Sequence, residues 1–192
     1  MYQSLLTDSS LYLTLLKLDE EFAEEVRSRG CGCGGTLHSA RYPRKPRGGP
    51  MEGEEAFRIR RSFCCAEQGC RRRTTPPSVL FLGRKVFFGA VVVLVCVLRH
   101  GATPMRLWKL QQLAGVSART VRRWRKWWLG VFVRSAFWRA ARGRLRAPVD
   151  EGGLPYSLLQ AFEGQGGASR LLGLLRFIRP LTSSSAAAGL AI

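Results

Sequence analysis

The stretch Leu110–Trp128, LQQLAGVSARTVRRWRKWW, combines three tryptophans and five basic residues in its last eleven positions. At about 100° per residue, a helical wheel places the apolar and the basic residues on opposite sides. The apolar side holds Val121, Trp124, Trp127 and Trp128, and the basic side holds Arg119, Arg122, Arg123 and Lys126. We therefore expect an amphipathic helix with its tryptophans in the core and its cations in solvent.

A turn and a shorter helix are predicted just before this basic helix. Ser117 occupies a typical N-cap position, and residues 114–116, Ala-Gly-Val, can form a tight turn. Residues 105–113 form an amphipathic pattern with three leucines on one face: Leu107, Leu110 and Leu113. Helix, glycine turn and basic helix make a helix-turn-helix, whose second helix enters the major groove of DNA. A solvated helix face in a bundle is the alternative interpretation.

The charge of the chain indicates a polyanionic partner. The 192 residues include 31 Lys and Arg against 13 Asp and Glu, a net charge of +18. The first thirty residues are themselves acidic, so the excess positive charge lies in the rest of the chain. Nucleic acid or an anionic membrane surface would attract such a chain. Arginine outnumbers lysine, which suits bidentate contacts to phosphates and guanine edges.

The most apolar run, Val86–Leu98, predicts a buried strand or a core helix. Its length is too short for a membrane-spanning helix, which needs about 20 residues. The leucine-rich N-terminus has no basic leader and continues into DEEFAEE, which is not typical of a secretory signal. We therefore expect a cytoplasmic protein that is associated with the nucleoid.

Five of the six cysteines lie in two clusters, at positions 31 and 33 and at positions 64, 65 and 70. In a cytoplasmic chain such clusters indicate a metal rather than disulfides. A structural zinc takes four thiolate or imidazole ligands, usually two from each of two tight loops. The spacings here are C-x1-C and C-x4-C, whereas C-x2-C is the usual one. Buried free thiols and disulfides are the alternatives.

Two strand-like pieces, residues 36–42 and 56–64, lie between the cysteine clusters. In the second piece apolar and polar residues alternate, with Phe57, Ile59 and Phe63 on one side. The two ligand loops, residues 31–35 and 65–70, are called the first and second knuckle. Two knuckles joined by a long hairpin make a zinc ribbon, and residues 43–55 are expected to be the mobile, solvated tip of the hairpin. Alternate residues of a strand face the same side, so this strand parity places Cys65 rather than Cys64 on the side of Phe63. His38 is an alternative ligand. The predicted ligands are Cys31, Cys33, Cys65 and Cys70.

Taken together, these segments resemble zinc-ribbon plus helix-turn-helix DNA-binding proteins of bacterial mobile elements, many of which are transposases or accessory proteins. The resemblance rests on FCC…GCRRRTTPPS, LAGVSARTVRRW and the later FW, and it covers roughly residues 30–145. It implies a structural zinc on the same four cysteines and DNA contacts by Arg119, Arg122 and Arg123. Gln111 departs from that family, which usually has a small residue there.

DNA-contacting residues are expected in two places. Those of the second helix are Ser117, Arg119, Thr120, Arg122, Arg123 and Lys126, which would meet base edges and adjoining phosphates. The arginine triplet, which we define as Arg71, Arg72 and Arg73, follows the second knuckle and would grip phosphates without sequence preference.

The acidic residues argue against catalysis. Common transposases hold two metal ions with three separated carboxylates. Downstream of the predicted helix-turn-helix only Asp150, Glu151 and Glu163 remain, and the first two are adjacent. Tyr156 is the only late tyrosine that a recombinase could use, and the sequence has no P-loop or HExxH pattern. We expect no enzymatic activity.

The sequence predicts an α+β fold, mainly α, in five segments. These are an acidic N-terminal helix (1–29), a zinc-ribbon-like domain (30–80), a helix-turn-helix domain (81–146), a C-terminal helical bracing segment (147–181) and a disordered tail (182–192). The leading hypothesis is a noncatalytic, zinc-stabilised protein that binds duplex DNA, as a mobile-element accessory protein or a transcriptional regulator. The alternatives are an RNA-binding protein, a cationic protein of a membrane surface and a remnant of a transposase.

Overall fold

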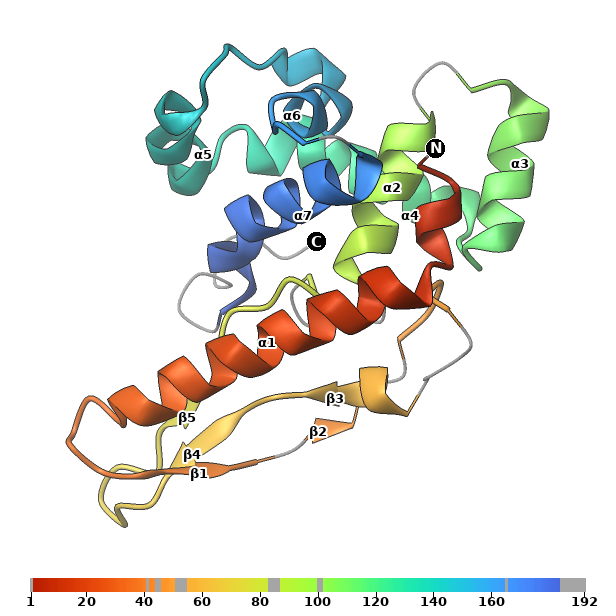
Figure 1. Cartoon of the computed structure of the whole chain (residues 1–192). Helices are drawn as coiled ribbons and strands as arrows, with labels where there is room; N and C mark the ends of the chain where they lie inside the picture. Colours follow the sequence, from red (N-terminus) through yellow and green to blue (C-terminus); the bar gives the residue numbers. More distant parts are fainter. Residues whose placement is uncertain are drawn as a thin grey trace.

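The structure is a computed structural model that describes residues 2–40, 42–43, 46–50, 55–82, 87–99, 102–164 and 166–183. It confirms an α+β fold that is mainly helical (Figure 1). The helices and strands are α1 (Ser9–Arg29), β1 (Leu37–Ser39), β2 (Tyr42–Pro43), β3 (Ile59–Arg60), β4 (Phe63–Cys65), β5 (Arg73–Thr74), α2 (Gly89–Arg99), α3 (Pro104–Leu113), α4 (Ala118–Lys126), α5 (Ala136–Ala141), α6 (Tyr156–Gln160) and α7 (Gly167–Ile178).

The predicted hairpin is present as one antiparallel ribbon beneath α1 (Figure 1). Leu37 lies opposite Cys65 and Tyr42 opposite Arg60, so the β1–β4 and β2–β3 pairs share one register. β5 adds a third strand to the outer edge of β4. The second strand-like piece, predicted from residue 56, begins later than expected. Residues 56–58 form a 3₁₀ turn that buries Phe57 in the helical core.

Two buried charged residues, Asp19 of α1 and Arg60 of β3, hold the ribbon against the helices. The Asp19 carboxylate accepts hydrogen bonds from the backbone N–H of Val79 (2.7 Å) and from the Ser78 hydroxyl. Burial raises the pKa of Asp19, against the lowering effects of Ser78 and of the Arg60 charge. Arg60 donates to the carbonyl of Pro76 (2.6 Å). Strand alternation did not predict a buried arginine, since its partners come from distant segments.

The C-terminal end of the described chain also joins this network. Thr182, which the sequence placed in a disordered tail, is buried, and its hydroxyl accepts a hydrogen bond from the backbone N–H of Ser78 (2.7 Å). Residues 184–192 of that predicted tail lie outside the described residues.

Residues 89–98 of the apolar run form most of α2, which is buried along almost its whole length. Of the two structures predicted for this run, the core helix is the one found; Val86 lies outside the described residues. Both α3 and α4 pack against α2. The apolar core extends from Leu5 to Leu181, and four of the five predicted segments contribute to it.

The buried side of α3 differs from the predicted one. Leu110 is buried as expected, but Leu113 is 44% exposed, so the prediction of one face with three leucines is wrong in part. The buried side is centred on Leu110 and on Ala114 in the turn. Met105 and Trp108 lie on the outer side, where they are 63% and 55% exposed.

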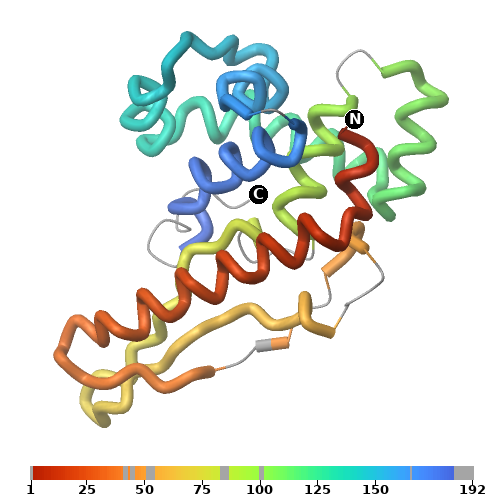
Figure 2. Tube along the Cα trace, viewed as in Figure 1, coloured from red at the N-terminus to blue at the C-terminus, as the bar shows by residue number. Residues whose placement is uncertain are grey.

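The hairpin tip, predicted to be mobile, packs against the helices over residues 46–50 (Figure 2). Gly48 has a φ of +80°, and a Cβ there would lie 2.5 Å from the carbonyl oxygen of Ala114. A Cβ on Gly49 would lie 2.4 Å from the ring of Phe88. Glycine is therefore needed at both positions for this close approach. The tip residues 44–45 and 51–54 lie outside the described residues.

The basic helix does not continue regularly beyond α4. Residues 127–132 form a π-helix, a wider turn that buries Trp127, Trp128 and Phe132 together. The Ser135 side chain then caps α5 by accepting from the backbone N–H of Trp138 (3.0 Å). In the described part of the chain, no helix is both long and apolar enough to cross a membrane.

Candidate metal centre and basic helix face

The first cysteine knuckle is a tight turn at the end of α1. The N–H of Cys31 donates to the carbonyl of Gly35 (2.9 Å), and the N–H of Gly34 donates to the carbonyl of Cys31 (2.8 Å). Gly34 has a φ of +86°, which favours glycine. A Cβ on Gly35 would lie 2.8 Å from the sulfur of Cys65, so the backbone there packs directly against the sulfur cluster.

The second knuckle, at the end of β4, is also a tight turn closed by backbone hydrogen bonds. The carbonyl of Glu67 accepts from the N–H groups of Cys70 and Arg71, both at 3.0 Å. The N–H of Cys65 donates to the carbonyl of Arg72 (2.9 Å), which closes the loop. Arg71 has a φ of +44°, a conformation uncommon for a residue with a side chain. This turn accommodates the irregular C-x4-C spacing.

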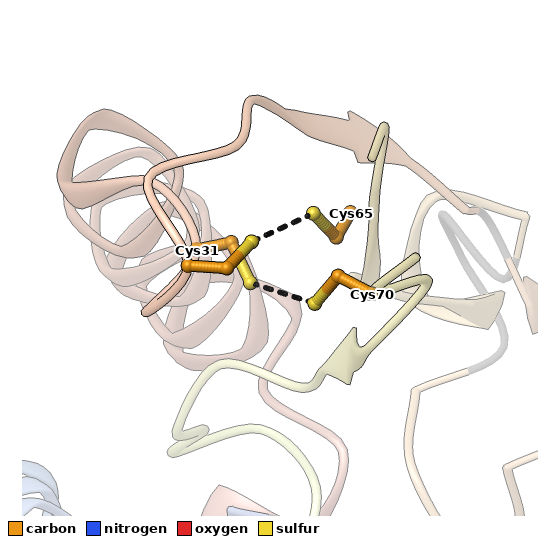
Figure 3. Close-up of side chains that lie close together, drawn as sticks. Cys31, Cys65 and Cys70 are labelled. Atoms are coloured by element: carbon orange, nitrogen blue, oxygen red, sulfur yellow. Dashed lines mark hydrogen bonds between the residues drawn. The ribbon is translucent and has the colours of Figure 1, made fainter. Parts of the chain in front are cut away.

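The two knuckles bring the four predicted cysteines together (Figure 3). Their sulfurs all lie within 4.8 Å of one another, with Cys31–Cys70 at 3.6 Å and Cys33–Cys65 at 3.5 Å. Four sulfurs at about 2.3 Å from a tetrahedral metal ion would be about 3.8 Å apart. The cluster therefore has the dimensions of a four-thiolate metal site.

Cys64 and His38 are not part of this cluster. They lie opposite each other in the β1–β4 register. Each is one position away from the Leu37–Cys65 pair in its own strand, so both lie on the other face of the ribbon. The Cys64 thiol lies near the backbone carbonyls of Cys65 (3.7 Å) and Arg71 (3.6 Å). The structure thus supports the choice of Cys65 by strand parity.

Backbone N–H groups point at the sulfurs of the cluster. Cys31 accepts from the N–H of Cys33, and Cys65 accepts from the N–H of Glu67, in each case two residues further along. Cys70 accepts in the same way from Arg72. Hydrogen bonds to the charged form favour a thiolate, which is the form that binds metal.

The four thiols also influence one another's ionisation. The N–H and thiol of Cys33 lower the pKa of Cys31 to about 7. Burial raises the pKa of Cys65 to about 12. The pKa of Cys70 is raised, because the effect of the Arg72 hydrogen bond is outweighed by the neighbouring thiols of Cys33 and Cys31. Four thiolates this close together need a cation to neutralise their charge.

The two helices predicted around the glycine turn are present as α3 and α4. The Ser117 hydroxyl caps α4 by accepting from the backbone N–H of Thr120 (3.2 Å). Gly115 in the turn has a φ of +58°. Val121 and Trp124 are buried as predicted, and the Trp124 ring meets Phe87 edge-on at 5.1 Å.

The predicted base-reading residues share one surface of α4. Ser117 is exposed at its start, and Thr120 is half-buried with its hydroxyl 3.0 Å from that of Ser117. The exposed cations, which we call the basic face, are Arg119, Arg122, Arg123, Arg125 and Lys126. Because the opposite side is buried, this face is fixed in its outward orientation.

The arginine triplet lies elsewhere. All three side chains are exposed beside the second knuckle, at the opposite end of the molecule from α3 and α4 in Figure 1. α1 connects the two ends, and its 21 residues span about 32 Å at 1.5 Å per residue. The structure therefore brings the predicted α4 residues together but not with the triplet.

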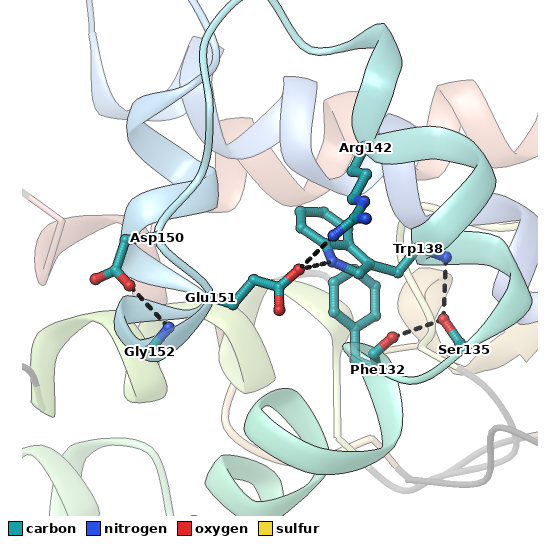
Figure 4. A network of polar contacts seen from close by, with 7 residues as sticks. All are labelled: Phe132, Ser135, Trp138, Arg142, Asp150, Glu151 and Gly152. Atoms are coloured by element: carbon teal, nitrogen blue, oxygen red, sulfur yellow. Dashed lines mark hydrogen bonds and ion pairs between the residues drawn. The ribbon is translucent and has the colours of Figure 1, made fainter.

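Each of the three late acids has a partner, and Figure 4 shows those of Asp150 and Glu151. Glu151 accepts hydrogen bonds from the Trp138 indole (2.7 Å) and from Arg142 (3.1 Å). Asp150 caps its own loop through the N–H of Gly152 (2.9 Å). Glu163 pairs with Arg146 in solvent. Glu151 thus links its loop to the α5 segment, whereas Asp150 acts within the loop and Glu163 forms an exposed surface pair.

Sequence reasoning missed a pair of arginines, Arg99 and Arg125. They line the same hollow although they lie 26 positions apart in the chain. No sequence signal could have paired them, because their proximity depends on how α2, α4 and residues 152–156 pack.

Comparison with known proteins finds no matching family model, curated protein or solved structure. Function is therefore inferred from the geometry and chemistry of the cysteine cluster and of α4.

Proposed function

We propose that this chain is a noncatalytic, zinc-stabilised protein that binds duplex DNA through α4, as an accessory protein of a mobile element or a transcriptional regulator. The observation that carries the proposal is the basic face: cations on the exposed side of a capped helix that follows a glycine turn. The first turns of such a helix meet base edges in the major groove. Arg119 and Arg122 lie in those turns.

Zinc is the metal that suits the cysteine cluster best. Four thiolates in a tetrahedron are typical of structural zinc sites, which leave no open position for a substrate. Cys31, Cys33, Cys65 and Cys70 would hold the ion. The ion would supply a cross-link between the end of α1 and the ribbon, and no reaction.

The ribbon can support α4 through its tip. Arg47 forms a backbone bridge to Phe87, whose ring packs on Trp124 of α4. Gly48 lies against the carbonyl of Ala114, in the turn between α3 and α4. The knuckles fix one end of the hairpin, and its other end abuts the helix-turn-helix. We therefore infer that the metal stabilises the orientation of α4 indirectly.

Selection from random duplexes in the presence of excess RNA tests this function. We expect zinc-loaded protein to enrich a short consensus, because arginines in the major groove distinguish guanine from other bases. Arg122→Ala is expected to weaken or remove part of that consensus. Arg139→Ala, an exposed arginine of α5, is the control and should leave it unchanged. Absence of enrichment, or complete competition by the RNA, would reject sequence-specific DNA binding.

A membrane-surface role is the second candidate, favoured by the outer side of α3. Met105 and Trp108 are exposed there beside Arg106 and Lys109. Tryptophan and basic residues on one exposed helix surface are typical of interfacial binding. Cosedimentation with anionic vesicles that duplex DNA does not reverse would favour this role over DNA binding.

A further inference from the structure

A hollow of about 180 Å³ lies at the edge of the basic face. It is lined by Cys96 and Arg99 of α2, by Arg125 of α4, and by residues 152–154 and Tyr156 of the following segment. Pockets for drug-sized ligands measure about 300–1,000 Å³. This hollow is therefore suited to a small group, of the size of one phosphate.

Both charged side chains that line the hollow are cationic. Arg99 and Arg125 form no ion pair with any residue that the structure describes. The acids of the adjoining loop are turned to other partners, because Asp150 caps the loop itself and Glu151 binds side chains of the α5 segment (Figure 4). Two guanidiniums that line one hollow without an acidic partner favour the binding of an anion there.

The Cys96 side of the hollow carries no negative charge near neutral pH. Cys96 is 9% exposed, and burial raises the pKa of its thiol to about 12, against the smaller lowering effects of Arg99 and Arg125. The two guanidiniums therefore keep their full attraction for an incoming anion.

The hollow adjoins the surface that we expect to meet DNA. Arg125 follows Arg122 by three residues, so the two side chains are neighbours on α4. Contacts to backbone phosphates commonly fix the position of a recognition helix on the duplex. A phosphate held beside Arg125 would fix α4 in this way.

We propose that Arg99 and Arg125 form a binding site for one phosphate group, supplied by the backbone of the duplex that α4 contacts. The identity of the source rests on the proposed function, whereas the phosphate chemistry of the site does not. Free inorganic phosphate therefore serves as an independent probe.

Thermal melts of the zinc-loaded chain test the site without DNA. Phosphate at ten times its Kd should raise the Tm of the wild type by about 3–5 °C relative to chloride at equal ionic strength. Arg99→Gln and Arg125→Gln should abolish the rise, and melts in chloride show whether each variant is folded. Arg139→Gln lies outside the hollow and should keep the rise. No rise in the wild type, or equal rises in all variants, overturns the proposal.

Duplex binding across a salt series identifies the source of the phosphate. Arg99→Gln should weaken all duplexes alike and lower the logarithmic salt slope by about one unit, as expected for one lost phosphate contact. If phosphate raises the Tm but Arg99→Gln leaves the salt slope unchanged, the site binds a free phosphorylated ligand. The duplex is then rejected as the source of the phosphate. A phosphate-dependent Tm without any DNA binding would reject the proposed function and leave the site standing.

Discussion

Cys70→Ser is expected to release the bound metal and to open the two knuckles. The wild type should contain about one zinc per chain, because four thiolates complete one tetrahedral site. Loss of one ligand leaves Cys31 without its partner sulfur at 3.6 Å, and the ribbon loses the cross-link between α1 and β4. Elemental analysis of the purified chain, together with hydrogen exchange over residues 31–39 and 63–74, measures both effects. Removing zinc from the wild type with a chelator should reproduce them, which keeps the test valid if the variant does not fold.

Cys64→Ser is the matched control for the metal site. Cys64 lies next to Cys65 in the chain, but its thiol faces backbone carbonyls on the other side of the ribbon. This variant should keep its zinc and its exchange protection. A well-folded wild type without zinc, or equal loss of metal from both variants, would contradict the four-thiolate site.

Trp124→Ala should lower the free energy of unfolding by about 3–5 kcal/mol, since removal of a large buried aromatic leaves a cavity. The indole is 1% exposed, and it packs edge-on against Phe87. The loss should also weaken DNA binding, because Trp124 fixes the side from which the basic face projects. Chemical denaturation of the zinc-loaded protein measures the change.

Trp108→Ala provides a comparison with the same change of residue. Trp108 is 55% exposed on the outer side of α3, and we expect its loss to alter stability by about 0.5 kcal/mol or less. If Trp108→Ala proved more destabilising than Trp124→Ala, the assignment of buried and exposed sides in α3 and α4 would be wrong.

Local patterns predicted the parts of the fold whose causes are local. The cap at Ser117 and the turn at Gly115 depend on neighbouring residues, and both are present. The choice of Cys65 followed from strand parity, which holds because β1 and β4 pair in register. The four-cysteine cluster could be predicted because two tight turns that flank a hairpin leave few ways to arrange the sulfurs.

Features that depend on distant contacts could not be predicted. Arg60 is buried because carbonyls of Pro76 and Thr182 accept its hydrogen bonds, and no local pattern indicates those partners. Leu113 is exposed because the packing of α3 on α2 selects a different side of the helix. The hairpin tip is packed for the same reason, since Gly48 and Gly49 fit against residues of the helical core.

The most direct test of DNA recognition by α4 is a salt titration of wild type, Arg122→Ala and Arg71→Ala on a selected duplex and its scrambled counterpart. Arg122→Ala should lose roughly 1–3 kcal/mol on the selected duplex and little on the scrambled one, as for a lost bidentate guanine contact. Arg71→Ala, in the arginine triplet, should weaken both duplexes alike and lower the salt slope by about one unit. Equal losses for both variants on both duplexes would contradict sequence recognition by α4 and leave a cationic protein without sequence preference.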